Sequence, residues 1–417
     1  MTFRLLYTLS IHIYHFLIRI SSLFNAKAKL WVEGRRNIFD RLQSEIPPDV
    51  EIAWFHCASL GEFEQGRPVI EAFRKGHPDF KILLTFFSPS GYEIRKNYEG
   101  ADWIYYLPID TPGNAKKFIQ IVNPVFAVFI KYEYWFNYIK ELKKNGLPLI
   151  VISAIFRPGQ RFFRWWGKWQ REMLREVTHF FVQNEPSELL LKNIGINQTT
   201  LSGDTRFDRV YQVAEQKKSF PLIAKFGGGD KILLAGSTWP QDEEIIISYI
   251  QSQPQGIKFI FAPHEVHNQR VESLIGKLPD NCLRFSEAND ENIDRAKILI
   301  IDSIGILSHL YQYAAVAYIG GGFGVGIHNI LEAATFGNPV VFGPNYEKFQ
   351  EAKELLDLGG AFTISTDKEF QVIINKLFAD DQFHKNASDI AKQYVEDKTG
   401  ATKQIIEFID EKLLSPV

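Results

Sequence analysis

Apolar residues along this 417-residue chain fall into short runs, and helical patterns follow several of them. In the first half these runs predict strands at Glu51–His56, Lys81–Phe87, Trp103–Leu107, Phe126–Ile130, Pro148–Ser153 and His179–Val182. Helical patterns at Phe63–Lys75 and Trp135–Lys144 illustrate the alternation. Nearly continuous apolar strands that alternate with helices are typical of a doubly wound parallel sheet.

The alternation stops at Gly203–Asp230, where Lys217-Lys218 and three successive glycines indicate a linker. It restarts with strands expected at Lys231–Ala235, Lys258–Ala262, Lys297–Ile301, Ala315–Ile319 and Pro339–Phe342. We therefore expect an α/β protein with two Rossmann-like domains, at residues 31–212 and 228–417, whose parallel sheets face an interdomain cleft. The last helical pattern, Ala401–Leu414, has no strand after it and is free to pack back on the first domain.

Residues 1–30 form a separate N-terminal segment that is rich in Leu, Ile, Phe and Tyr. His12, His15 and Arg19 interrupt it, so it lacks the ~20 successive apolar residues of a membrane-spanning helix. We expect an amphipathic helix that lies in a membrane interface. The alternative is a helix packed on the protein's own surface.

Charge is distributed unevenly along the chain. Residues 1–210 hold 28 Lys and Arg against 21 acids, whereas the remainder holds 19 against 28. The basic half predicts an anionic partner, and nucleic acid, an anionic membrane and a phosphorylated lipid all fit. The only two cysteines, Cys57 and Cys282, fall in different domains, which excludes a disulfide framework and favours a reducing cytosol.

The richest loop for ligand binding is Gly320–Glu332, after the strand expected at Ala315–Ile319. Its glycines would let the backbone approach a ligand, and free amides at the following helix start would attract phosphate. The spacing G-x-G-x-x-G is absent, which argues against a nicotinamide or flavin cofactor. Glu332 could bind sugar hydroxyls or merely complement the helix dipole, and His328 and Asn329 could simply be caps.

Two other strand ends of the second domain carry ligand-binding candidates. Backbone around Gly305, in Asp302–Ile306, could meet a base or ribose, although a helix cap by Asp302 or Ser303 explains the pattern equally well. In Gly236–Thr238, Thr238 and Gln241 resemble a capping box, which is compatible with phosphate contact.

The first domain offers carboxylates at strand ends. Glu62 follows the strand Glu51–His56 through Gly61, which permits a tight turn, and could act as a general base or only as a first-turn acid. Glu133 follows Phe126–Ile130, and Ser90 lies in a loop that could hold an anion. For Ser90 and Glu133 a plain cap or turn is an equal alternative.

Basic and aromatic residues are interleaved from Arg157 to Arg175. This composition suits a phosphorylated lipid at a membrane interface, and it would also suit single-stranded nucleic acid. A core helix with a solvated basic face is the structural alternative. The basic residues that we expect to bind the acceptor are Arg161, Arg164 and Lys168.

Taken together, these segments resemble the Kdo transferases of lipopolysaccharide synthesis, which are GT-B glycosyltransferases. His56–Glu62 is similar to that family's H-x-A-S-x-G-E motif, and Gly203–Asp208 to its G-N-x-K-F-D. Tyr132–Asn137 resembles E-x-E-L-W-x-N, but Lys131 replaces the first acid. Gly326–Glu332 keeps Gly-Gly-His-Asn-x-x-Glu except for Ile327, and Pro263-His264-Glu265 replaces the usual Pro-Arg-His.

The resemblance implies an inverting enzyme that moves Kdo from CMP-Kdo to a lipid A precursor (lipid IVA) at the cytoplasmic side of the inner membrane. It implies no cofactor, no metal and no nucleic-acid partner. Glu62 would be the general base, and the acceptor-binding or supporting residues would be Ser59, Gly61, Ser90, Glu133, Arg161, Arg164 and Lys168. The residues expected at the nucleotide sugar are Ser237, Thr238, Pro263, His264, Ile304, Gly305, Ile306, Gly326, His328, Asn329, Ile330, Leu331 and Glu332.

Two other functions remain open from sequence. One is a GT-B enzyme with another donor, such as a UDP-sugar transferase or epimerase. The other is a non-catalytic sugar-binding protein, which would need neither Glu62 nor the basic-aromatic segment.

Overall fold

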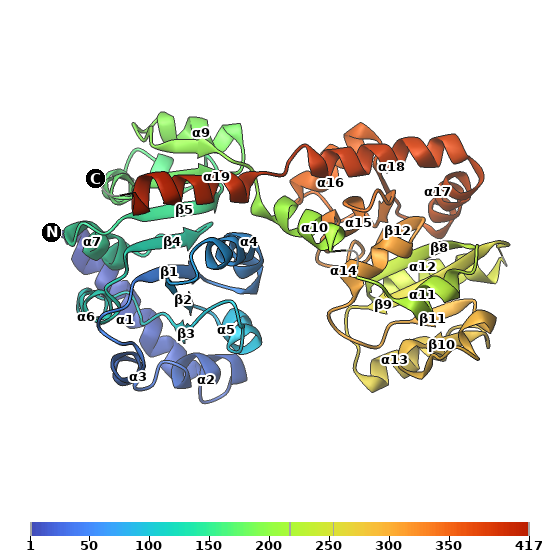
Figure 1. The fold of residues 1–417 in the computed structure, drawn as a ribbon, viewed down its shortest axis with the longest axis horizontal. Coiled ribbons are helices and arrows are strands. Elements are labelled where there is room, and N and C mark those ends of the chain that lie inside the picture. Colours follow the sequence, from blue (N-terminus) through green and yellow to red (C-terminus); the bar gives the residue numbers. More distant parts are fainter. Residues whose placement is uncertain (1, 217, 253, 416–417) are drawn as a thin grey trace. The chain divides into compact units, whose positions relative to one another are not determined.

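The computed structural model describes residues 2–216, 218–252 and 254–415, and it divides into two compact units (Figure 1). The first domain comprises residues 1–209 and 399–417, and the second comprises residues 210–398. The second domain therefore starts before the expected residue 228, and the chain returns to the first domain for its final helix.

The first domain is built on a parallel sheet of seven strands in the order β3-β2-β1-β4-β5-β6-β7. The strands are β1 (Ile52–Cys57), β2 (Lys81–Phe86), β3 (Trp103–Tyr106), β4 (Phe126–Ile130), β5 (Leu149–Ala154), β6 (His179–Val182) and β7 (Thr199–Leu201). All six strands predicted for this half are confirmed, and β7 is an addition.

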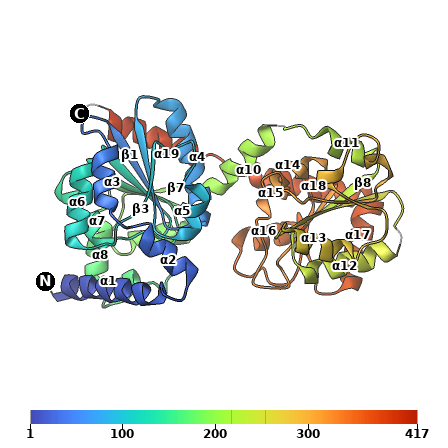
Figure 2. The same cartoon turned by 90° about the horizontal axis from the view of Figure 1, so that it is seen from below.

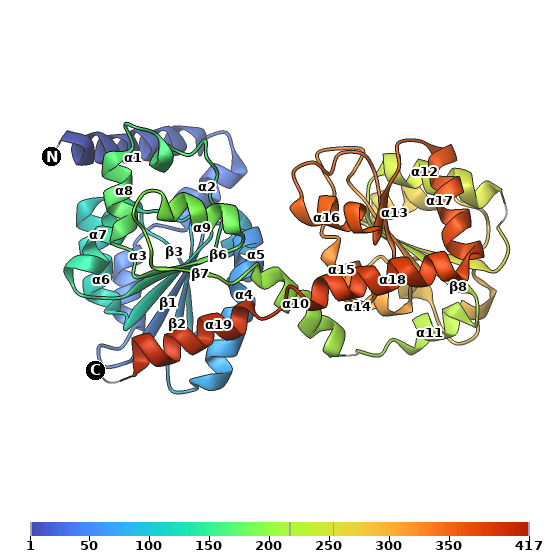
Figure 3. The same ribbon diagram turned by 90° about the horizontal axis from the view of Figure 1, so that it is seen from above.

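Helices cover both faces of this sheet (Figures 1 and 3). They are α1 (Thr2–Ser21), α2 (Ala26–Glu33), α3 (Ile38–Glu45), α4 (Leu60–Gly76), α5 (Pro89–Arg95), α6 (Pro112–Val122), α7 (Phe136–Lys144), α8 (Lys168–Arg175), α9 (Glu185–Lys192) and α19 (Ala401–Phe408). A short 3-10 turn, Arg161–Phe163, precedes α8, and π-helical turns at Ile409–Leu414 continue α19.

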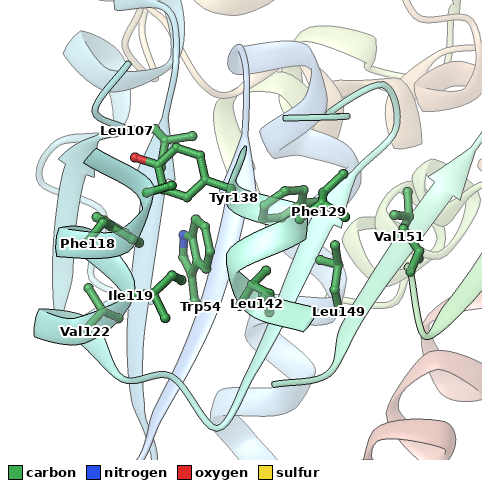
Figure 4. Packing of buried hydrophobic residues seen from close by; sticks show 14 of the residues in the cluster. Trp54, Leu107, Phe118, Ile119, Val122, Phe129, Tyr138, Leu142, Leu149 and Val151 are labelled. Carbon is green, nitrogen blue, oxygen red and sulfur yellow. The ribbon is translucent and has the colours of Figure 1, made fainter. Parts of the chain in front are cut away.

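Side chains of successive strand residues alternate between two cores. Trp54 and Phe129 pack with Phe118 of α6 and Tyr138 of α7 on one face, as Figure 4 shows. On the other face, Phe55 and its neighbours pack with buried residues of α4 and α19. Because both faces are buried, the strands are apolar throughout, which is why they stand out in the sequence.

The second domain holds a parallel sheet in the order β10-β11-β9-β8-β12-β13-β14. Its strands are β8 (Lys231–Thr238), β9 (Ile257–Pro263), β10 (Cys282–Arg284), β11 (Ile298–Ile300), β12 (Val316–Ile319), β13 (Val340–Phe342) and β14 (Ala361–Thr363). Its helices are α10 (Thr205–Glu215, which begins in the first domain), α11 (Pro221–Gly227), α12 (Pro240–Gln251), α13 (Asn268–Ile275), α14 (Leu307–Leu310), α15 (Leu331–Ala334), α16 (Gln350–Leu358), α17 (Asp367–Ala379) and α18 (Asp381–Glu396), and short 3-10 turns lie at Phe285–Glu287, Ile293–Arg295 and Tyr311–Tyr313.

The predicted linker at Gly203–Asp230 is wrong for most of its length, because α10 and α11 occupy it. Val210 and Val213 of α10 are buried, and Pro221 begins α11 in the first-turn position that proline favours. Polar residues between these apolar positions gave the appearance of a linker. Lys217, part of the predicted linker signal, lies outside the described residues.

Candidate active site

Each sheet reverses its strand order at one point, and ligands of doubly wound sheets bind beyond the strand ends there. In the first sheet the reversal lies between β1 and β4, whose following loops carry Glu62 and Glu133. In the second sheet it lies between β8 and β12, which Trp239 and the glycine-rich loop follow. Most of the predicted site residues therefore stand at these two positions, one in each domain.

Glu62 lies in the first turn of α4 and faces its N-cap. Its Oε2 atom accepts the backbone N–H of Ser59 at 2.9 Å and the Ser59 hydroxyl at 3.0 Å. Glu62 therefore completes a capping box with Ser59, a more specific structural role than the plain first-turn acid that the sequence offered as the alternative. Burial, followed by the negative charge of Glu133, raises the pKa of Glu62, although the bonds from Ser59 oppose the shift. A half-buried carboxylate with a raised pKa is suited to accept a proton.

Space is open beside Glu62. The turn from β1 to α4 is tight, as expected, but Gly61 does not form it, because this residue is already helical and has an ordinary φ. A Cβ added to Gly61 would meet nothing within 4 Å, and the glycine therefore leaves room over the start of α4. Gly91 brings α5 close, because its added Cβ would lie 3.1 Å from the Ser59 carbonyl carbon. Ser90, exposed at the start of α5, bonds to Ser88 as a plain cap would.

Glu133 is buried, 5% exposed, within a polar network under the β1 and β4 ends. Its Oε2 atom lies 3.1 Å from Nε2 of His56 and accepts the Trp135 indole N–H at 2.6 Å. The other imidazole nitrogen of His56 lies 2.9 Å from the Thr85 hydroxyl. A buried carboxylate with these partners is fixed in place, and its charge acts on Glu62 at a distance.

The Gly203–Asp208 motif holds the domain together. Asp208 accepts the backbone N–H groups of Gly400 at 2.6 Å and of Thr402 at 2.7 Å, and also the Thr402 hydroxyl at 2.7 Å. These bonds fix the start of α19 where the chain returns to the first domain. This role could not be predicted from the sequence, because 192 residues separate Asp208 from Gly400.

The basic-aromatic segment divides into an inner and an outer part. Phe162 and Phe163 pack on Phe156, and Trp169 of α8 packs on Phe136. Trp165 and Trp166 are exposed at 89% and 46%. The predicted acceptor-binding residues Arg161, Arg164 and Lys168 are also exposed. The single core helix of the structural alternative is therefore wrong, because Gly167 breaks the segment before α8.

Helix α1 lies beside α8 on the first domain (Figures 2 and 3). Tyr7 packs on Trp169 and donates its hydroxyl to Asp110 at 2.6 Å. The opposite side of α1 and the turn after it expose apolar side chains at 45% to 88%, namely Leu5, Leu6, Leu9, Ile13, Phe16, Leu17, Ile20, Leu23 and Phe24. We call this set the α1 apolar face. Among the described helices none has the length and apolar character needed to span a bilayer.

The glycines of the second domain's loop serve mainly to pack loops against each other. A Cβ on Gly320 would lie 2.3 Å from the Ser237 carbonyl oxygen, and one on Gly322 would lie 2.6 Å from backbone atoms of Gly343. Gly321 and Gly326 adopt positive φ values of 93° and 137°. The close packing of these loops by itself accounts for glycine at positions 320 and 322. Val325, by contrast, is 94% exposed at the tip of the loop.

Two buried acids of α12, which sequence reasoning missed, position the surrounding loops. Asp242 accepts the backbone N–H groups of Trp239 and Gly321, each at 2.9 Å, and so ties the β8 end to the glycine-rich loop. The predicted Thr238–Gln241 capping box is wrong, because Asp242 caps the helix and Thr238 donates to Glu243 at 2.8 Å. Arg270 pairs with Glu243 through both carboxylate oxygens. The only local signal in the sequence was that both acids lie in the first turn of the helix that follows β8.

The other residues that we expected to bind the nucleotide sugar are partly buried in the core and partly accessible. The side chains of Ile330 and Leu331 are in the core, so only their backbone could meet a ligand. Asn329 caps Leu331 N–H at 3.2 Å and donates to Glu332 at 3.2 Å, with Glu332 in the first turn of the four-residue α15. Ile304 is 86% exposed next to Gly305, whose φ is 90°.

The loops around Ile304 and Ser237 have unexpected local structure. Asp302 and Ser303 do not cap α14, because Ile306 takes that position and Asp302 accepts Ser286 N–H at 3.0 Å. Ser237 adopts a positive φ of 54° at a bulge between β8 and β9. This strain places the Thr238 side chain inward and the Trp239 ring at the surface.

Three rings stack at the β8, β9 and β12 ends. The His264 ring lies 4.7 Å from the Trp239 ring and 4.6 Å from the His328 ring, with interplanar angles of 26° and 24°. The Trp239 indole N–H donates to Nε2 of His328 at 3.3 Å. Burial and the neighbouring His264 lower the pKa of His328, while Asp242 opposes this shift. No set of three or more His, Cys, Asp or Glu side chains that could hold a metal ion occurs in the described residues.

Comparison with known proteins gives a consistent result for sequence and fold. Residues 33–209 match the family described as 3-deoxy-D-manno-octulosonic-acid transferase (kdotransferase). A 3-deoxy-D-manno-octulosonic acid transferase of Rickettsia bellii is 27% identical over 376 residues, 87% of this chain and 86% of the relative. One of Chlamydophila psittaci is 24% identical over 339 residues, 79% and 78% of the two chains.

Among solved structures, a UDP-GlcNAc 2-epimerase from Neisseria meningitidis superposes with a TM-score of 0.60 at 15% identity, over 87% of this chain and 100% of that one. At this identity the superposition shows a shared fold of two α/β domains.

Proposed function

We infer that this chain is a Kdo transferase, a glycosyltransferase of GT-B type, and propose that it moves Kdo from CMP-Kdo to a lipid A precursor. The observation that carries the inference is the similarity to Kdo transferases over more than three quarters of the chain, which spans both domains. We propose the donor, the acceptor and the residue roles on the same ground.

We place the donor nucleotide at the β8–β12 strand ends. Support comes from the reversal of strand order there, from the accessible backbone at Ile304 and Gly305, and from Glu332 at the start of α15. Glu332 and Asn329 would bind sugar or ribose hydroxyls. No residue set suited to a metal is needed, because the phosphate of a nucleoside monophosphate carries less charge than that of a diphosphate.

Glu62 is the proposed general base. The acceptor oxygen forms the new bond to the anomeric carbon of Kdo, and the bond from that carbon to the CMP phosphate oxygen breaks with its electron pair on the phosphate. Glu62 takes the proton of the attacking hydroxyl. One carboxylate suffices for a single displacement, which inverts the anomeric configuration. The raised pKa of Glu62 and the open space beside Gly61 support this role.

We further propose that the first domain binds the cytoplasmic side of the inner membrane through the α1 apolar face. Exposed apolar patches of this extent mark interaction surfaces, and a helix with one apolar side fits the lipid interface. Trp165, Trp166 and the cations Arg161, Arg164 and Lys168 lie in the sequence just before or at the start of α8, and α8 is the helix that lies beside α1. Indole rings and basic side chains are suited to phosphorylated lipid headgroups.

A comparison of nucleotides tests the donor. CMP at about one hundred times its Kd should stabilise the folded protein by ~2.7 kcal/mol, because it binds only the native state. We expect a higher Tm with CMP and little change with UDP or UMP. Stabilisation by UDP alone would instead favour a UDP-sugar enzyme, whose members share this fold.

A further inference from the structure

The loops at the centre of the second sheet's carboxyl edge contain histidines but neither lysine nor arginine. These segments are residue 239 after β8, 264–267 after β9, 301–306 after β11 and 320–330 after β12. Their only groups that can become cationic are His264, His267 and His328. A nucleotide phosphate bound at this edge must therefore be met by imidazole, by backbone amides or by a more distant cation.

Two of the three histidines are already engaged. His267 caps α13, because its Nδ1 atom accepts Arg270 N–H at 3.2 Å, and its Nε2 atom lies 3.5 Å from Glu265. His328 accepts the Trp239 indole N–H at 3.3 Å, so its Nε2 atom has no proton, and its pKa is lowered. Arg270, on the adjacent helix, is neutralised by Glu243.

His264 differs from both. The Trp239 and His328 rings both stack on one face of its imidazole, because the 3.3 Å hydrogen bond that joins them places them side by side. Its side chain is exposed, and neither ring nitrogen has a hydrogen-bond partner among the described residues. The backbone N–H of His264 donates to the Thr238 carbonyl at 3.0 Å, which fixes the loop to β8. An imidazole held in this way by stacking and by its backbone presents two N–H donors when protonated.

We infer that His264, stacked on the paired rings of Trp239 and His328, binds the phosphate of the donor nucleotide as an imidazolium, so that nucleotide binding takes up a proton. The inference rests on the proposed CMP-Kdo donor. A proton from solvent forms a new N–H bond on the imidazole of His264, and no other covalent bond forms or breaks. Around this ring the titratable groups are His328 on the β12 loop, Glu265 and His267 on its own loop, and Asp242 of α12 behind His328.

Imidazole changes charge between about pH 5 and 8, so the phosphate contribution to binding should weaken as pH rises. The test is isothermal titration calorimetry of the full chain with CMP and with cytidine, which lacks the phosphate, at pH 6.5 and 8.5 (about a hundredfold change in proton concentration). At pH 6.5 we expect CMP to bind more tightly than cytidine, and from pH 6.5 to pH 8.5 we expect the ratio of the two affinities to fall about tenfold or more.

Variants separate the phosphate contact from a structural role. His264→Gln should lose most of the preference for CMP over cytidine at pH 6.5, and His264→Arg should keep it with little dependence on pH. His267→Asn, which keeps a cap for α13, and Lys348→Gln, which removes the nearest lysine in sequence after β13, should each behave like the unchanged chain.

Three results would overturn the inference. One is unchanged CMP binding in His264→Gln, and another is a loss of CMP preference in Lys348→Gln instead. The third is a pH dependence that persists in His264→Arg. If the unchanged chain binds no CMP at either pH, the proposed donor fails as well, and this outcome is distinct from CMP binding that does not depend on His264.

Discussion

The Glu62 carboxylate accepts both the backbone N–H and the hydroxyl of Ser59, at 2.9 and 3.0 Å, and so the proposed base is also the residue that closes the first turn of α4. A cap and a base are compatible, because both hydrogen bonds converge on Oε2. The second oxygen, Oε1, is left for another partner.

Glu62→Gln keeps the side-chain shape and an oxygen that can accept the Ser59 bonds, but it cannot take a proton. We expect turnover to fall by about 10²–10⁴, the usual contribution of a general base. Thermal unfolding should shift little. Equal rates for the variant and the unchanged chain would remove Glu62 from the mechanism.

The pH dependence of kcat/KM should report Glu62. A base works only when it is deprotonated, so a raised pKa moves the loss of activity on acidification to a higher pH than an ordinary glutamate would give. Glu133→Gln removes the negative charge that raises this pKa, and the acidic limb should then move to lower pH. Ser59→Ala removes a bond that lowers the pKa and should move the limb the other way. A limb that stays fixed in both variants would show that another group controls it.

Membrane binding should depend on the α1 apolar face. The double substitution Leu9→Glu and Phe16→Glu places two charges where we propose lipid, and each lost burial is worth about 1.5–3 kcal/mol. We expect co-sedimentation with vesicles of phosphatidylethanolamine and phosphatidylglycerol to fall at least about tenfold. Leu189→Glu on α9 is the matched control, since Leu189 is equally exposed but lies outside this face. Equal losses in both variants would contradict the assignment of the face.

Of the fourteen strands in the described part of the chain, the sequence located ten within one or two residues, and for β4 and β6 both bounds agree. The pattern failed for β7, β10 and β14, each of three residues. All three are edge strands with partly exposed side chains, so they lack the continuous apolar run that marks a central strand. Strand β8 was found but runs three residues past its predicted end, into the Ser237 bulge.

Site residues at the ends of central strands could be predicted, because those strands are recognisable in the sequence and the topology of a parallel sheet puts the loops that follow them at one edge. The partners that such residues find on distant elements could not be predicted. The contact between Asp242 and Gly321 joins residues 79 positions apart, and that between His56 and Glu133 joins residues 77 apart. These two contacts depend on how strands and helices pack together, which the local sequence pattern does not predict.

Asp242→Ala tests whether this packing positions the donor site. It would leave the N–H groups of Trp239 and Gly321 without their partner, at a cost of roughly 2–4 kcal/mol in unfolding free energy. We expect lower stability in urea together with weaker CMP binding. Asp208→Ala, in the first domain, should lower stability by a similar amount and leave CMP binding unchanged once the protein is folded. If both variants bind CMP alike, Asp242 has no role in the donor site.

The account is tested most directly by incubating the purified full chain with CMP-Kdo and a tetraacylated lipid A precursor and measuring the product by mass spectrometry. We predict a lipid whose mass has increased by one or more Kdo residues, with release of CMP and loss of the product in Glu62→Gln. An unchanged lipid mass, with CMP-Kdo intact while a UDP-sugar is consumed, would contradict the assignment.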